Sequence, residues 1–265
     1  DVTITEYPVG PGSQPYEITS GPDGRLWFTQ QVSMNAPIGA ITPSGMITEY
    51  PTMDGANNGI VSAKNELWFC NGTPGLLGSM TTNGTPSAPY KGSSLFAITL
   101  GPDGYLWTSA VTPAQEIIAL DFSGNVIATY KVNDTVPSIT TGPDKNLWFV
   151  AQTNSAVVQM TTGGKMASFP LAIGSSPASI TSGPDGNLWF TEPGTNKIGK
   201  ITTSGTITEY DIPTPKAKPI DIVTGPDGNL WFTENDVNQI GQITPNGVIT
   251  EYPVPTKNSG RSEER

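Results

Sequence analysis

The chain has 265 residues, of which 35% are hydrophobic and 14% charged, with 30 glycines and 25 prolines. This composition is typical of a folded β-rich domain, and no hydrophobic run is long enough to cross a bilayer. A net charge of −10 and a pI near 4.4 disfavour nucleic acid and membrane surfaces as partners, while cations, glycans and other small molecules remain open.

The first predicted element is an outer strand over residues 3–8, and six repeats of about 41 residues follow it. Each repeat contains one of the six tryptophans of the chain, within strands predicted at residues 26–28, 67–69, 106–108, 147–149, 188–190 and 230–232. Repeats of this length are typical of propeller blades. The sequence therefore predicts an all-β, six-bladed β-propeller of four-stranded antiparallel blades, with residues 1–255 as a single domain and 256–265 as a disordered tail.

The fifth repeat shows the order of elements within one blade. Strands are expected at residues 179–181, 188–191, 197–202 and 206–210, and a Gly-Pro-Asp-Gly turn at 183–186 joins the first two. One such turn aspartate per blade cannot converge on a ligand, so turn chemistry explains these residues. The turn is lost in the second repeat, where residues 63–66 are one residue shorter.

The ends of the chain hold one outer segment more than six blades need. Residues 3–8 and residues 248–253 both read Thr/Val-Ile-Thr-Glu-Tyr-Pro, and either could complete the last blade or add a fifth strand. We leave these alternatives open.

Two weaker features, together with the acidic, lysine-poor composition, predict secretion, and we also expect a monomer. The chain starts at Asp1 rather than at Met, and glycosylation sequons stand at Asn71, Asn83 and Asn133. The single cysteine, Cys70, cannot form an intrachain disulfide and is interpreted as a buried structural thiol.

The repeat motif resembles a known family. It reads Ile-Thr-x-Gly-Pro-Asp-Gly-x-Leu-Trp-Phe-Thr-Glu, then Asn-x-Ile-Gly-x-Ile-Thr, then Gly-x-Ile-Thr-Glu-Tyr-x-(Ile/Val)-Pro, most fully in residues 180–213 and 222–253. This combination resembles the virginiamycin B lyase (streptogramin B lyase) family. The resemblance implies a seven-bladed propeller that opens a cyclic depsipeptide by elimination, with Mg²⁺ and a histidine base near the channel mouth.

Two departures from that family argue against the same reaction. The chain has six tryptophan motifs and no histidine at all. The inner-strand positions that match the family's histidines hold side chains that cannot act as a base near neutral pH: Tyr16, Asn58, Phe96, Pro137, Ala178 and Ile220. We therefore expect no streptogramin lyase activity.

Acidic residues remain at a matching position. Glu192 and Glu234 follow the Trp-Phe-Thr strand in two successive blades, where Gln30 and Asn71 stand in the first two. We expect these side chains to emerge on one rim and to hold Mg²⁺ or Ca²⁺ with help from Asp221 or Glu17. The alternative is that each glutamate belongs to the repeat consensus and is hydrogen-bonded to the next blade.

Three functions stay open, and no motif for an organic cofactor is present. The first is binding of a small molecule, glycan or protein partner at the channel mouth, near the irregular loops 30–37, 71–76 and 111–115. Its candidate ligand-binding residues are Tyr16, Glu17, Gln30, Asn58, Asn71 and Asp221.

The second is a divergent metal-assisted lyase that uses Tyr16, Glu192 or Glu234, or a lysine such as Lys216 or Lys218, in place of histidine. The third is a lactonase-like hydrolase with a central Ca²⁺ held by Glu, Asn and Asp, residue types that Glu17, Asn58, Asn71 and Asp221 supply.

Overall fold

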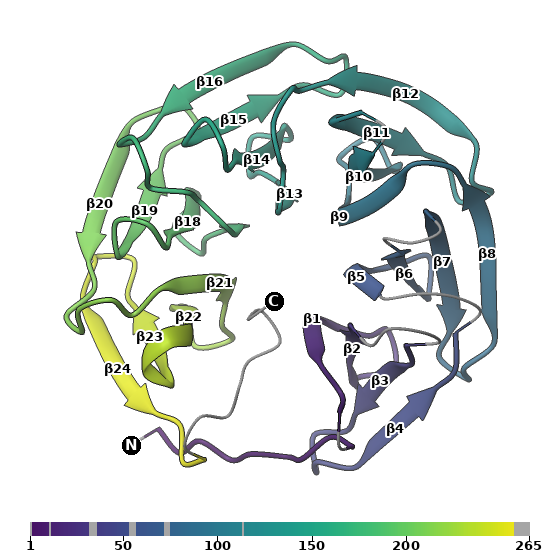
Figure 1. Ribbon diagram of the computed structural model, residues 1–265, viewed down its shortest axis with the longest axis horizontal. Coiled ribbons are helices and arrows are strands. Elements are labelled where there is room, and N and C mark those ends of the chain that lie inside the picture. Colours follow the sequence, from purple (N-terminus) through teal and green to yellow (C-terminus); the bar gives the residue numbers. More distant parts are fainter. Residues whose placement is uncertain are drawn as a thin grey trace. The chain divides into compact units, whose positions relative to one another are not determined.

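The computed structural model describes residues 2–10, 12–31, 36–52, 57–71, 75–112 and 114–256. Its strands form six four-stranded antiparallel sheets, each built from four consecutive strands, and the fold is the predicted six-bladed β-propeller (Figure 1). One short 3-10 helix, Asn235–Val237, interrupts the last blade. Among the described residues, no helix is long and apolar enough to span a membrane.

The blades fall into two compact units, of which one comprises Tyr7–Leu100 and Gly104–Asn133. Its three blades are built from β1 (Pro15–Ser20), β2 (Leu26–Gln30), β3 (Ile38–Ile41), β4 (Ile47–Tyr50), β5 (Asn57–Ala63), β6 (Glu66–Asn71), β7 (Leu76–Thr81), β8 (Pro86–Lys91), β9 (Ser94–Leu100), β10 (Leu106–Thr112), β11 (Glu116–Leu120) and β12 (Val126–Lys131).

The other unit comprises Asp1–Glu6, Gly101–Asp103 and Asp134–Glu264. Its blades are built from β13 (Ile139–Thr141), β14 (Leu147–Ala151), β15 (Ala156–Met160), β16 (Met166–Pro170), β17 (Ile180–Ser182), β18 (Leu188–Glu192), β19 (Lys197–Ile201), β20 (Ile207–Asp211), β21 (Pro219–Thr224), β22 (Leu230–Glu234), β23 (Gln239–Ile243) and β24 (Ile249–Pro253). The expectation that residues 1–255 are a single domain stays a prediction.

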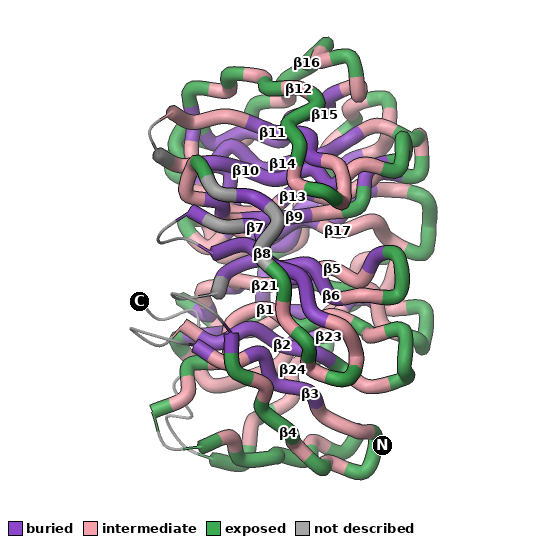
Figure 2. Tube along the Cα trace, turned by 90° about the vertical axis from the view of Figure 1, so that its right-hand side faces the viewer, coloured by how far each residue is buried: buried purple, intermediate pink, exposed green. Residues whose placement is uncertain are grey.

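Within each unit the first strands of neighbouring blades lie side by side. In one unit β1 lies beside β5 and β5 beside β9, and in the other β13 lies beside β17 and β17 beside β21. The second strands carry the buried tryptophans, and every residue of β14 and β18 is buried. Outer strands such as β12 and β16 are mostly exposed, which Figure 2 shows as green and pink segments beside the buried inner strands. The apolar second strands thus form the core between neighbouring blades of the same unit.

The repeated turn fixes the tryptophan, as its chemistry predicts. In the fifth blade, Asp185 Oδ1 accepts hydrogen bonds from the backbone N–H of Asn187 and from Nε1 of Trp189, at 3.2 and 3.0 Å. Asp23, Asp144 and Asp227 hold their tryptophans in the same way. The turn aspartates are therefore structural, and their side chains satisfy indole donors that would otherwise be buried unpaired.

The competition between the two terminal segments is settled in the unit that contains residues 2–6 and the last blade. The last blade takes all four of its strands from the last repeat, with Ile249–Pro253 as its outer strand. Residues 2–9 form no strand, and Glu6 Oε2 accepts hydrogen bonds from N and Oγ1 of Thr256 at 3.0 and 2.9 Å. The N-terminal segment is thus no fifth strand. Of the predicted tail, residues 257–265 lie outside the described residues.

Candidate functional site

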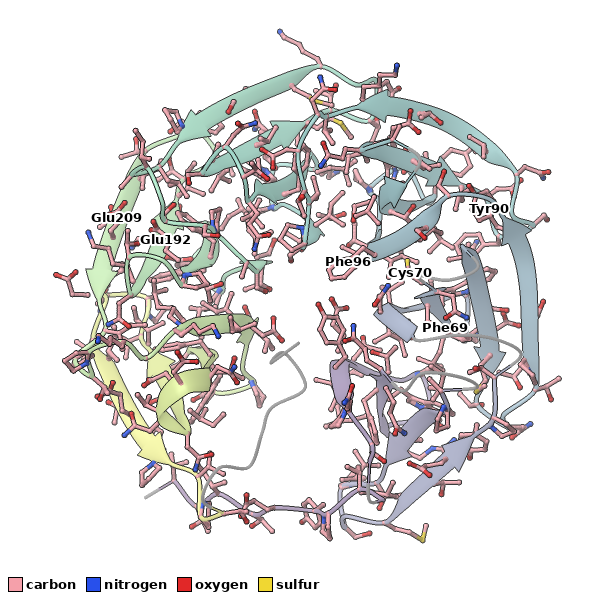
Figure 3. The ribbon with its side chains drawn as sticks, in the orientation of Figure 1. Phe69, Cys70, Tyr90, Phe96, Glu192 and Glu209 are labelled. Carbon is pink, nitrogen blue, oxygen red and sulfur yellow. The ribbon has the colours of Figure 1, made fainter. Side chains whose placement is uncertain are left out.

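Glu192 ends β18 and is fully buried, with 0% of its surface exposed. The hydroxyl of Thr195 donates to its Oε2 at 3.3 Å. Burial, followed by the negative charge of Glu209, raises the pKa of Glu192 to about 7, although Thr195 and Ser175 oppose the rise. Figure 3 labels Glu192 and Glu209, which come from β18 and β20 of the same blade. Glu192 is therefore a carboxyl group that changes charge near neutral pH.

A polar pocket of about 570 Å³ lies in the same unit, next to the segment that contains Ser175. The β14–β15 loop and the link between the fourth and fifth blades line it, with Gln152, Thr153, Asn154, Ser155, Ile173, Gly174 and Ser176.

Two contacts hold these pocket walls in place. The buried carboxylate of Asp134 accepts the backbone N–H groups of Thr153 and Asn154 at 2.9 and 3.0 Å. On the other wall, the backbone N–H of Gly194 donates to the carbonyl of Ser175 at 3.0 Å. This second contact connects the pocket wall to the turn that follows Glu192.

The expectation that Glu192 and Glu234 emerge on a rim is wrong, because both side chains are 0% exposed. Asp221 is also engaged: its Oδ1 accepts the hydroxyl of Ser179 at 2.7 Å and the backbone N–H of Ile222 at 2.9 Å, and burial raises its pKa. In the part of the chain that the structure describes, no three Asp, Glu, Cys or His side chains gather to hold a metal. Metal binding by Glu192 and Glu234 stays a prediction.

Three predicted residues of the other unit make contacts between blades. The ring of Tyr16 packs edge-on against Phe96, with centroids 6.0 Å apart. Glu17 Oε2 accepts the backbone N–H of Ile60 at 3.1 Å. Asn58 donates to the carbonyl of Leu95 at 3.1 Å. Glu17 and Asn58 thus connect neighbouring first strands, and Tyr16 reaches from the first strand of the first blade to that of the third.

Gln30 and Asn71 occupy the position of the buried glutamates and are buried too, at 1% and 2% exposure. Nε2 of Gln30 donates to Glu49 on β4 of its own blade at 2.9 Å. Gln30 thus bonds within its own blade, whereas the alternative interpretation expected the glutamates at this position to bond to the next blade. Parts of the predicted rim loops, residues 32–35, 72–74 and 113, lie outside the described residues.

The sequons and the cysteine differ in exposure. Asn83 and Asn133 are exposed. Asn71 is buried, so a glycosylating enzyme could reach its amide only if β6 opened. Gly72 and Thr73 of that sequon lie outside the described residues. Cys70 is buried, its thiol donates to the carbonyl of Ala97 at 3.7 Å, and burial raises its pKa well above the usual value. The expected structural thiol is confirmed.

Comparison with known proteins identifies the family. The sequence profile of the virginiamycin B lyase family matches residues 86–262. The chain belongs to the virginiamycin B lyase family. A streptogramin B lyase structure shares 37% identity, covering 94% of this chain and 85% of that one, with a TM-score of 0.85. No significant match was found among curated proteins.

Two further solved structures place the chain among other propellers. A virginiamycin B lyase from Staphylococcus aureus is 36% identical and covers 92% of this chain and 85% of its own, with a TM-score of 0.83. A periplasmic gluconolactonase from Pseudomonas aeruginosa is 13% identical over 91% of this chain and 85% of its own, with a TM-score of 0.72, which shows the shared fold alone.

The pocket beside Ser175 was missed by the sequence analysis. Its polar residues belong to turn-like stretches that look like ordinary connections, because Thr, Asn and Ser are common there. The available signal was Ile173, a large apolar residue next to Gly174 that belongs to no strand and is fully exposed.

Proposed function

We propose that this virginiamycin B lyase family member binds a neutral glycan or other hydroxyl-rich small molecule in the pocket beside Ser175 and does not open streptogramins. The pocket of about 570 Å³ carries the proposal. Its volume is within the usual range for small-molecule sites. Amide and hydroxyl side chains of Gln152, Thr153, Asn154 and Ser176 surround one apolar residue, Ile173. A set of uncharged donors and acceptors with one apolar contact suits a sugar ring.

The position of the pocket supports the same proposal. It lies where a loop between second and third strands meets a link between blades, although the ligand-binding residues predicted from the sequence lie elsewhere. Asp134 holds one wall through two backbone hydrogen bonds, so the polar groups are positioned before a ligand arrives. We extend the proposal to a secreted protein, since secreted proteins meet extracellular glycans.

The absence of histidine from the sequence supports the second half of the proposal. A virginiamycin B lyase variant from Staphylococcus aureus in which one histidine is replaced by alanine is catalytically inactive, and its structure was solved with quinupristin. In this chain the matching first-strand positions include Tyr16, Asn58 and Phe96, and these make contacts between blades. Retained ligand binding without a base is the expected outcome.

A glycan array followed by calorimetric titration tests the binding. Asn154→Ala and Ile173→Ser, both at exposed positions, should each lower the affinity for the best array ligand at least tenfold. Val248→Ser is the matched control, since Val248 is exposed in the same unit outside the pocket. No array ligand, or equal affinity in all variants, would refute the proposal.

A divergent lyase or lactonase is the second candidate, and the pKa of Glu192 near 7 favours it. A carboxyl group with such a pKa can donate or accept a proton near neutral pH. The described residues do not gather three acidic ligands, so no step is assigned to Mg²⁺ or Ca²⁺. Assays with quinupristin, uronic-acid glycans and lactones, with and without either ion, test this candidate. Turnover that Glu192→Gln abolishes would replace the binding proposal.

A further inference from the structure

One of the six repeated tryptophans has lost the ring that covers the others. The indoles of Trp27, Trp107, Trp148, Trp189 and Trp231 each stack on an aromatic ring from the outer strand of the same blade, with centroids 5.3 to 6.1 Å apart. Trp68 instead meets the edge of Phe122 from the following blade, at 5.1 Å and 70°. The hydroxyl of Tyr90, on the outer strand of its own blade, accepts the backbone N–H of Ser93.

Two of the other blades also place a cation over the tryptophan. The guanidinium carbon of Arg25 lies 4.5 Å from the Trp27 ring centroid, and Nζ of Lys200 lies 5.0 Å from that of Trp189. Each cation also donates to a backbone carbonyl in the next blade, at 2.6 and 3.1 Å respectively. The scaffold thus has a recurrent place for a cation between tryptophan and the neighbouring blade.

The second blade lacks this internal cation. Ser79 stands opposite Trp68 in the strand pairing, as Lys200 stands opposite Trp189. Glu66 precedes the second-strand leucine, where the first blade has Arg25. Ser79 and Glu66 therefore stand at the two positions from which two other blades bring positive charge.

An open pocket of about 480 Å³ occupies this place, lined by Lys64, Glu66, Trp68, Ser79, Ser87 and Phe122. The shortened turn at residues 63–66 contributes Lys64 and Glu66 to the lining. In this turn the carbonyl of Ala63, instead of a turn aspartate, accepts a hydrogen bond from Nε1 of Trp68 at 3.2 Å. Lys64 places its Nζ 5.5 Å from the Phe122 centroid.

We propose that this pocket binds the guanidinium or ammonium group of a small organic cation, in the place that Arg25 and Lys200 fill from within the chain in other blades. Phe122 and the small exposed part of Trp68 offer the aromatic surface, Glu66 the countercharge, and Ser79 and Ser87 hydroxyl acceptors. The net charge of −10 raises the local concentration of cations. Lys64 opposes the ligand by like-charge repulsion, so its removal strengthens binding.

Butylguanidinium and its neutral isostere butylurea test the proposal on full-length protein labelled with 5-fluorotryptophan. Among the six fluorine signals, the one lost in Trp68→Phe should move with butylguanidinium, and butylurea should leave it in place. Ser79→Lys supplies the missing internal cation and should weaken butylguanidinium at least tenfold. Gln242→Lys adds the same charge at the equivalent position of the last blade and should change affinity less than twofold.

Two charge variants complete the test. Glu66→Gln should weaken butylguanidinium at least threefold, and Lys64→Ala should strengthen it. Equal response to butylurea, undiminished binding by Ser79→Lys, or no movement of the Trp68 signal would each overturn the proposal.

Discussion

Replacing Glu192 by glutamine removes a buried carboxyl group whose ionisation opposes folding, so the substitution should stabilise the protein more at high pH than at low pH. The pKa rises from an ordinary value of 4.5 to about 7 in the folded chain, mainly through burial and then through Glu209. At about 1.4 kcal/mol per pKa unit, the full penalty is roughly 3 kcal/mol. Glutamine keeps the shape and can still accept the Thr195 hydroxyl hydrogen bond.

The sign follows from where each state loses its proton. Below pH 4.5 Glu192 is protonated in both the folded and the unfolded chain, so it does not lower the free energy of unfolding. Between pH 4.5 and about 7 Glu192 ionises in the unfolded chain but keeps its proton in the folded chain, so the free energy of unfolding falls as pH rises. Above the folded pKa the penalty is constant. The gain from Glu192→Gln should therefore grow by about 2 to 3 kcal/mol between pH of about 5 and about 8.

Urea denaturation followed by tryptophan fluorescence, at both pH values, measures this difference. Asp211→Asn is the control, because Asp211 lies on β20 of the same blade with its side chain 89% exposed. That control should show little change between the two pH values. An equal stability change for Glu192→Gln at both pH values would contradict the assigned pKa and the burial that causes it.

Three further outcomes are expected. Asp185→Ala should lower stability by about 1 to 3 kcal/mol in urea denaturation, because it leaves the buried Trp189 indole without its acceptor. Gly199→Ala should cost about 3 kcal/mol or prevent folding, since the new Cβ would lie within 2.1 Å of the Phe190 ring; wild-type stability in the same assay would contradict this. Cys70 should resist a thiol reagent in the folded protein and react once in urea, and fast native labelling would contradict its burial.

The blade architecture could be predicted because the repeats share motifs for the same turn and strands. The Gly-Pro-Asp-Gly turn, the Leu-Trp-Phe strand and the Ile-Thr-Glu-Tyr strand each agree with the packing that the structure contains, as the Asp185–Trp189 contact illustrates. The position of the acidic side chains could not be predicted in the same way. A glutamate at a strand end is normally solvated, and only the packing of neighbouring segments puts Glu192 and Glu234 at 0% exposure.

The first-strand residues show the same limit. Alternation along a strand indicates which side chains share a face, but it does not tell what meets them from the next blade. Glu17 accepts a backbone N–H of β5 at 3.1 Å, and Asp221 accepts the Ser179 hydroxyl at 2.7 Å. A carboxylate of the type that binds metals can therefore be hydrogen-bonded to a neighbouring blade instead. The sequence contains no signal that distinguishes a metal ligand from such a structural carboxylate.

Departures from the repeat are a better guide to binding sites than the repeat itself. A residue that recurs in every blade is needed where two blades pack, as the tryptophans are, and turn aspartates hold four of these tryptophans. A position where one blade lacks a feature that the others share can leave space beside it. The shortened turn at 63–66 and the missing stacked ring over Trp68 are two such departures in one blade, and Lys64, Glu66 and Trp68 line the same pocket. In a chain of this family, comparing its own blades can therefore locate a site that similarity to the lyases does not indicate.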